Sequence, residues 1–438
     1  MRIIRHAPTL VLCACLHTVP GIVWGTEPLL TADMAVAQAL THSPELSADT
    51  EEIKGLQQAA ELLPLLPNPV LELEGATGSL TGSRDERSAG IALSQELPLS
   101  ATASRRRAVA RAEAEAARLQ LESRKRSLAD EVRRAWGAAA LAAQRLELLR
   151  SQTTMTDTLL TIARERFVAG DLPEFEVQLA DLDRRRQLLR QTEQQAELMR
   201  VRRQLALLLG LADGQALPPL APVVMLQQPL SSDDQLVSDN LAHNPDLAAK
   251  RKEQERDEEA LALARAEAVP NLTLGLSYRN ERSSQNAYQL NGGLLTPGTE
   301  RTTDHILGLK LAIPLPLFSR NQAELARANG RVNASRHRVE ATRRTAAAEL
   351  RDLLAQHQLA LTALELHRSA LGPVARENLQ IQQEAFKQGE VGMQTVLDEK
   401  RRFTEQQEAE LNALKAAYDS YSRLQSAFDN PKTERGKP

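Results

Sequence analysis

The chain contains few aromatic residues and only two cysteines, and its positive and negative charges nearly balance. Phe, Trp and Tyr make up 3% of the 438 residues, which is too few for a thick globular core built on large rings. Lys and Arg number 54 against 57 Asp and Glu, for a formal net charge of -3. Proteins that bind nucleic acid need surplus basic residues to displace counterions from phosphates, so this balance predicts no nucleic-acid partner.

The two cysteines, Cys13 and Cys15, lie in an N-terminal segment that is typical of an export signal. Two arginines precede an apolar run that is too short and too interrupted for a membrane-spanning helix. The pattern predicts a signal peptide over 1–25, cleaved after Gly25, which leaves a mature chain without thiols or disulfides. The alternative is lipoprotein processing, with Cys15 acylated.

Long hydrophobic runs are also missing beyond the signal, so any membrane span must be made of strands. The composition is dominated by Ala, Leu, Arg, Glu and Gln, which suits long helices with polar flanks. No glycine-rich phosphate loop, serine-centred elbow or zinc-protease helix occurs in the sequence. We therefore predict that the protein is not an enzyme and needs no cofactor.

The sequence repeats itself at a distance of roughly 200 residues. The stretch ALTHSPEL at 39–46 recurs as NLAHNPDL at 240–247, and in both a short helix is expected to stop before the proline and another to start after it. The proline-rich stretch at 217–232 separates the copies. The predicted organisation is a signal peptide over 1–25, a first repeat over 26–216, a linker over 217–232, a second repeat over 233–429 and a polar tail over 430–438.

Each copy contains two short segments in which apolar and polar residues alternate, so that one face is apolar and the other polar or small. The predicted strands are at about 70–75, 89–97, 272–280 and 305–313. The loops between them, 76–87 and 281–303, are rich in Gly, Ser, Asn and charge. This pattern suits an outer-membrane barrel with long outer loops, but alternation alone equally suits two hairpins covered by helices in a soluble protein.

After each pair of predicted strands, the sequence contains long segments with almost no proline or glycine. The predicted long helices are at about 102–167, 174–209, 320–388 and 394–428. At about 1.5 Å per residue the longest run spans roughly 100 Å, which no compact domain of this size needs. From Leu128 to Phe167, apolar and small residues keep the spacing of a coiled-coil seam. Gly170 and Gly389 then mark turns, so each copy is predicted to be two strands joined to a long helical hairpin.

Four strands are too few to close a membrane barrel, since the smallest closed barrels have about eight. A membrane role therefore requires several chains to share one barrel. The predicted fold class is mainly α with a small β part: duplicated long coiled-coil helical hairpins, plus four amphipathic strands that contribute to an oligomeric transmembrane β-barrel.

With these features in place, the chain resembles the TolC-like outer-membrane efflux protein family over nearly all of its mature length. The matching features are the duplicated starts, the strand pairs, the long helices and two turns. The turn residues are Gly170, Asp171, Leu172, Pro173, Gly389, Glu390, Val391 and Gly392. The stretches PNP at 67–69 and IPLPLFSRNQ at 313–322 are similar to the branch that serves heavy-metal pumps of the cobalt–zinc–cadmium type.

The resemblance implies a homotrimer in the outer membrane with a long helical tunnel through the periplasm, which acts as the passive exit duct of a tripartite efflux pump. The implied partners are a periplasmic adaptor protein, an inner-membrane transporter of the resistance-nodulation-division type and outer-membrane lipid. The eight turn residues are implied to form the periplasmic tips that contact the adaptor. Divalent heavy-metal cations are the candidate solute.

Acidic residues gather just inside both predicted tips. Asp181 and Asp398 lie a turn or two inside and are the candidates for a ring of charge at a constriction. The alternative is ordinary helix N-terminal acids and solvated faces. His42 and His243 occupy equivalent repeat positions and are predicted to be helix-end residues, with no metal site on this chain.

The main alternative function is that of a periplasmic coiled-coil adaptor, which also carries a signal and a helical hairpin. Adaptors normally have one hairpin within a small lipoyl-like domain. Here the hairpin occurs twice and each copy has an amphipathic strand pair, which favours the channel. A periplasmic scaffold or enzyme has no supporting residue pattern.

Overall fold

The computed structural model describes residues 29–80, 85–212, 215–225 and 234–428, so the predicted signal peptide and polar tail lie outside the described residues. The first repeat consists of α1 (Ala32–His42), α2 (Pro44–Leu62), β1 (Val70–Thr77), a 3-10 turn (Gly78–Leu80), β2 (Arg87–Leu97), α3 (Thr102–Val168) and α4 (Glu174–Leu208). The second repeat consists of α5 (Asp234–Ala242), α6 (Pro245–Ala266), β3 (Leu272–Asn291), β4 (Leu294–Ala312), α7 (Gln322–Leu366), a π-helical turn (His367–Leu371), α8 (Gly372–Gln388) and α9 (Met393–Phe428).

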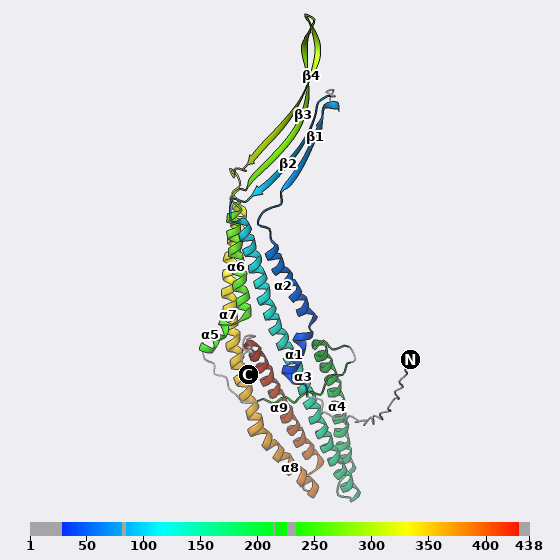
Figure 1. Cartoon of the computed structure of the whole chain (residues 1–438). Coiled ribbons are helices and arrows are strands. Elements are labelled where there is room, and N and C mark those ends of the chain that lie inside the picture. Colours follow the sequence, from blue (N-terminus) through cyan, green and yellow to red (C-terminus); the bar gives the residue numbers. More distant parts are fainter. Residues whose placement is uncertain (1–28, 81–84, 213–214, 226–233, 429–438) are drawn as a thin grey trace, which may run out of the picture.

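These elements form an elongated molecule, with the sheet at one end and the turns of two helical hairpins at the other (Figure 1). The two repeats lie side by side: β2 pairs with β3 in the sheet, α3 packs on α6 near it, and α3 packs on α9 farther away. Among the helices of the described residues, none is both long enough and apolar enough to cross a membrane.

The paired prolines start helices in the same way in both repeats. The Ser43 hydroxyl accepts a hydrogen bond from the Leu46 amide at 3.3 Å, and the Asn244 side chain accepts one from the Leu247 amide at 3.0 Å. Just before each cap, the Nδ1 atoms of His42 and His243 lie 3.0 and 2.9 Å from the carbonyl oxygen four residues earlier in their own helix. Both histidines thus have the helix-end position that the sequence predicts.

One antiparallel sheet in the order β1-β2-β3-β4 contains strands from both repeats. Leu71 pairs with Leu93, Leu93 with Leu276 and Leu276 with Leu309. These leucine side chains therefore form a row that crosses all four strands. The strand order makes β1 and β4 the two edges of the sheet in a single chain.

The second hairpin of the sheet is longer than predicted. Residues 281–303 were expected to form a loop, but β3 continues to Asn291 and β4 begins at Leu294. The glycines between them, Gly292 and Gly293, have φ of 63° and 90° and make the tight turn. The polar residues of this segment remain in strands because each is paired across the hairpin, from Ser283 with Thr302 onward.

The main hydrophobic core lies where α1, α3, α4, α7 and α9 meet. The predicted seam of α3 is buried or half-buried from Leu128 to Ala163, whereas its last member, Phe167, is 43% exposed because the helix ends there. Two short segments outside the helices meet at this core. Leu30 pairs with Leu220 in a parallel bridge, and the Leu30 carbonyl accepts a 2.8 Å hydrogen bond from Trp136 Nε1. The first part of the predicted linker is therefore packed against the helices.

Gly137, the one glycine in α3, allows a close approach between helices. A Cβ atom at this position would lie 2.1 Å from Cε1 of Tyr418, whose hydroxyl donates to the Arg133 carbonyl at 3.1 Å. Although Ala is the better helix former, Gly137→Ala is expected to lower the free energy of unfolding by about 1–3 kcal/mol through overpacking. Gly330→Ala on α7, where nothing lies within 4 Å, should instead stabilise slightly. Thermal unfolding of the two variants should shift in opposite directions.

His357 makes the contact between α7 and α9 sensitive to acid. Its side chain is buried, and Nδ1 lies 2.9 Å from the Ser420 hydroxyl, which itself donates to the Ala417 carbonyl. Burial lowers the pKa of His357 below its usual value of 6.5. Since the unfolded chain takes up the proton first, stability should fall as pH drops below about 6.5. The unfolding temperature of His357→Gln should depend less on pH over this range than that of the wild type.

Candidate functional site

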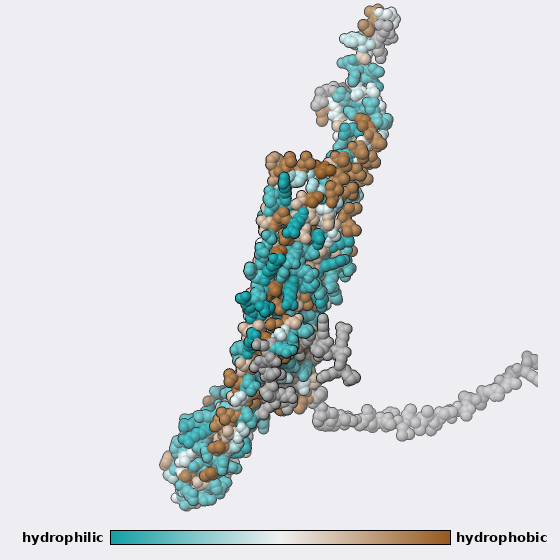
Figure 2. Space-filling model, turned by 90° about the vertical axis from the view of Figure 1, so that its left-hand side faces the viewer, coloured by the Kyte–Doolittle hydropathy of each residue, from teal (hydrophilic) through white to brown (hydrophobic). Residues whose placement is uncertain are grey.

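The sheet has one apolar face that no other described part of the chain covers. Rows of large apolar side chains cross all four strands on this face, and Figure 2 shows them gathered on the part of the sheet nearest the helices. The members are Leu71, Leu73, Ile91, Leu93, Leu274, Leu276, Tyr278, Leu307, Leu309 and Leu311. Leu73 and Leu309 are 76% and 77% exposed. A patch of this size indicates a surface made for a lipid or protein environment.

The opposite face of the sheet is polar and lined with small residues. Gly90 lies between Glu74 and Arg279 in the register, and the Glu74 carboxylate reaches the Arg279 guanidinium over it at 3.1 Å. Further along this face, Gly275 pairs with Lys310 and Ser277 pairs with Gly308. The sheet thus separates an apolar surface from a polar one, as strands do in a membrane barrel filled with water.

At the far end of the molecule, the two repeats end their hairpins with the same turn. Gly170 and Gly389 have φ of 83° and 86°, which glycine adopts without strain. The Asp171 amide donates to the Arg166 carbonyl at 2.9 Å, and the Glu390 amide donates to the Ala385 carbonyl at 2.9 Å. Both turns are therefore Schellman caps, which place the predicted tip residues in equivalent positions.

The two tips share one small hydrophobic core. Leu160, Ala163 and Leu172 from the first hairpin pack with Phe386 and Met393 from the second. Leu172 is buried and Val391 packs on the edge of this cluster. The tips of both repeats therefore form one structural unit, which we call the tip core.

Two charged side chains join the tips across the repeats. Arg166, at the end of α3, donates to the Phe386 carbonyl at 2.8 Å and places its guanidinium 4.9 Å from the centre of that phenyl ring. In the other direction, Glu176 on α4 accepts a hydrogen bond of 2.8 Å from the Met393 amide, at the start of α9. A cation thus lies at the C-terminal end of α8 and an anion at the N-terminal start of α9, which suits both helix dipoles.

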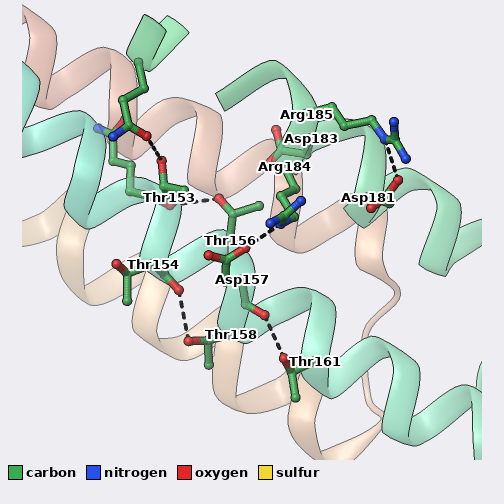
Figure 3. Close-up of polar contacts among 12 residues, drawn as sticks. Thr153, Thr154, Thr156, Asp157, Thr158, Thr161, Asp181, Asp183, Arg184 and Arg185 are labelled. Atoms are coloured by element: carbon green, nitrogen blue, oxygen red, sulfur yellow. Dashed lines mark hydrogen bonds and ion pairs between the residues drawn. The ribbon is translucent and has the colours of Figure 1, made fainter. Parts of the chain in front are cut away.

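The two gate candidates are both paired with arginine. Asp181 pairs with Arg185, one turn along α4 (Figure 3), and their nearest atoms are 2.7 Å apart. The Arg164 guanidinium lies 3.9 Å from the other carboxylate oxygen. The hydrogen bond from Arg185 lowers the pKa of Asp181, so this carboxylate is ionised at neutral pH. Asp398 lies 3.6 Å from Arg401 and also accepts from Gln394. The structure does not bring Asp181 and Asp398 into contact with each other.

Lys400 was not predicted from the sequence as a site residue. Its side chain is only 5% exposed, its Nζ atom lies 2.5 Å from a carboxylate oxygen of Asp183, and it also donates to the Thr156 hydroxyl. The burial of Lys400 could have been predicted from its spacing in the sequence. Lys400 follows the buried Val396 by one helical turn and therefore lies on the buried stripe of α9.

A second polar contact lies deeper in the helices. Gln187 on α4 donates to Gln152 on α3 at 2.8 Å, and Gln152 donates to Gln407 on α9 at 3.0 Å. In the described part of the chain, no group of three or more His, Cys, Asp or Glu side chains is arranged to hold a metal ion. The three glutamines connect α3, α4 and α9.

Comparison with known proteins gives a consistent picture. Residues 236–428 match the family model described as outer membrane efflux protein. The chain is 22% identical over 398 residues to the cobalt-zinc-cadmium resistance protein CzcC of Cupriavidus metallidurans, covering 90% of this chain and 89% of that protein.

Solved structures of similar fold also align with at least 90% of this chain. The structure of CusC, described in connection with transmembrane channel formation, has a TM-score of 0.72 at 21% identity, covering 90% of this chain and 91% of that one. The CmeC outer membrane channel of Campylobacter jejuni has a TM-score of 0.72 at 15% identity, covering 98% and 97%. The similarity of fold therefore includes the sheet and both helical hairpins.

Proposed function

We infer that this chain is an outer membrane efflux protein, and from that premise we propose that it is the passive exit channel of an efflux pump. The observation that supports the proposal best is the two-faced sheet at the end of long paired hairpins. Its apolar face suits lipid, and its small and polar face suits a water-filled passage. The chain supplies no reaction, and transport through it is driven by a separate pump.

The free edges of the sheet support a shared barrel. In the described part of a single chain, β1 and β4 each have one edge without a partner strand, and four strands are too few to close a barrel. Because all neighbours in the sheet are antiparallel, β4 of one chain can pair with β1 of the next in the same antiparallel sense. We propose a homotrimer, in which three copies of the four strands form one barrel and the hairpins form a ring beneath it.

The tips are the proposed docking surface for a periplasmic adaptor and, through it, an inner-membrane transporter. Apolar side chains lie exposed around the first turn, with Val168 at 86% and Phe175 at 59%. The same tips would narrow the tunnel, and Asp181 and Asp398 remain the proposed acidic positions there. Their arginine partners would reduce the charge that each presents to a passing ion.

Divalent heavy-metal cations are the proposed solute, because the relative that aligns over 90% of the chain is named for cobalt, zinc and cadmium resistance. A conduit does not need a tight metal site, since tight binding would slow conduction. An adaptor function is not supported by the comparisons, which include the outer membrane efflux protein model and an outer membrane channel.

Disulfide cross-linking of the sheet edges tests the shared barrel. Leu73→Cys on β1 is combined in turn with Leu307→Cys, Leu309→Cys or Leu311→Cys on β4, in a chain expressed with its own signal in a Gram-negative host. At least one pair should give cross-linked trimers in the outer-membrane fraction, whereas each single variant should not. The proposed function would be rejected if no pair cross-linked and the protein fractionated with the inner membrane or the soluble periplasm. Metal sensitivity of a deletion strain then tests the solute.

A further inference from the structure

The apolar face of the sheet is too short for the membrane that the proposed function requires. On β4 the apolar rows run from Leu307 to the strand end at Ala312, and on β2 they run from Ile91 to the end at Leu97. These stretches contain six and seven residues. A tilted transmembrane strand needs about 9–11 residues to cross the hydrocarbon, so β4 falls about three to five residues short and β2 about two to four.

The apolar residues needed to complete the span cannot lie at the end of the sheet farthest from the helices. There the apolar face ends at Tyr278, whose hydroxyl lies 2.6 Å from Nδ1 of His305 and whose ring stacks on that imidazole. Beyond this pair the same face continues with Asn280 and Arg282. An aromatic ring with a polar tip is typical of the boundary between lipid and water. The rest of the apolar band must therefore be sought at the end of the sheet nearest the helices.

Four connections join the sheet to the helices there, and we call their uncharged parts, together with the last residue of α2, the junction segments: 62–69, 98–101, 268–271 and 313–319. None of them contains Asp, Glu, Lys or Arg. Figure 2 shows hydrophobic side chains around the top of the helical part, beside the sheet. The exposed members are Leu62, Leu65, Leu66, Leu99, Val269, Ile313, Leu315, Leu317 and Phe318. Phe318 is 94% exposed, which is, together with Leu80, the highest value among the large apolar residues that the structure describes.

The backbone of the junction segments lacks many of the amide donors of an ordinary loop. Seven prolines remove amide donors that lipid could not satisfy. They are Pro64, Pro67, Pro69, Pro98, Pro270, Pro314 and Pro316. Side chains from neighbouring elements bind carbonyl oxygens: Arg107 Nε donates to Leu63 at 2.9 Å, and Gln95 Nε2 donates to Pro67 at 2.8 Å. Charged residues directly flank the junction segments, at Glu61, Glu267 and Arg320.

We propose that the junction segments lie in the periplasmic leaflet of the outer membrane, with their leucines and Phe318 inserted among the lipid acyl chains. A span of about ten residues counted from Leu307 and Ile91 ends near Leu317 and Ala101, inside these segments. The inference rests on the proposed barrel and adds where its membrane boundary lies. The hydrocarbon edge falls at the helix ends, below the sheet, and the ring of helices begins directly at the lipid surface.

Fluorescence quenching in vesicles tests this boundary. Phe318→Trp is purified as the processed, assembled protein and reconstituted in phosphatidylcholine whose acyl chains carry bromine either near the carbonyl end or near the middle. Leu309→Trp on the apolar face and Phe175→Trp at the tip are the matched controls, all three positions being exposed in the single chain. Wild-type protein supplies the background, because Trp136 is buried.

The inference predicts that Phe318→Trp loses most of its added fluorescence to bromine near the carbonyl end and less to bromine near the middle. Leu309→Trp should be quenched by both lipids, and Phe175→Trp by neither. Quenching of Leu309→Trp without quenching of Phe318→Trp would overturn the inference and leave the proposed barrel intact. Failure to quench either variant would contradict both, since the sheet itself would then lie outside the bilayer.

Discussion

Phe386→Ala is expected to open the tips of both hairpins while the sheet and the oligomer stay assembled. Phe386 is completely buried in the tip core, against residues of both repeats, and it supplies the ring beneath the Arg166 guanidinium. Removing a buried phenyl ring costs about 3–5 kcal/mol, from lost burial and from the cavity that remains. Since the tip core is separate from the main core around Trp136, the loss should be local.

Amide hydrogen exchange of the detergent-extracted particle measures this effect. Peptides covering the end of α3, the start of α4, the end of α8 and the start of α9 should all exchange faster in Phe386→Ala, because the tip core joins them. Peptides from the sheet should exchange as in the wild type. Ile381→Ala is the control, since Ile381 lies on the same helix but is 56% exposed. Equal effects of the two substitutions would show that the tips are not held together by a common core.

The long helices and the turns could be predicted because their signals are local. The spacing from Leu128 to Ala163 indicates a buried stripe whatever the stripe packs against, and Gly170 and Gly389 mark turns that need positive φ. The strand faces followed from alternation for the same reason. The limit of this approach appears at 281–303, where a polar composition predicted a loop. Strand pairing there depends on the partner strand, and the partner is as polar as the segment itself.

The contacts between the repeats could not be predicted, because sequence separation hides them. Glu176 has the pattern of an acid in the first turn of its own helix α4, yet its carboxylate binds the Met393 amide at the start of α9. Arg166 likewise stands near the end of α3 but binds a carbonyl of α8. The gate residue Asp181 was predicted from its position near the tip. Its charge is partly neutralised by Arg185 and Arg164, which lie on the same face.

Asp183→Asn is expected to destabilise the contact between the hairpins much more than Lys400→Met does. The Lys400 ammonium is 5% exposed and has Asp183 as its only carboxylate partner among the ion pairs of the described residues. Asn at position 183 would leave a buried charge without a counter-charge, and breaking a buried pair in this way costs about 3 kcal/mol or more. Since the Asp183 side chain is 30% exposed and water can reach it, the effect should lie at the lower end.

Lys400→Met removes the charge and keeps the length of the side chain on the buried stripe of α9. The Asp183 carboxylate then remains partly hydrated and beside Arg186, which lines the same surface hollow between α4 and α9. We therefore expect a change of about 1 kcal/mol or less, and the double variant Asp183→Asn/Lys400→Met should recover most of the stability lost in Asp183→Asn. Thermal unfolding of the four proteins measures the coupling. Equal losses in the two single variants would mean that the ion pair itself, and not the buried ammonium, determines the stability of this contact.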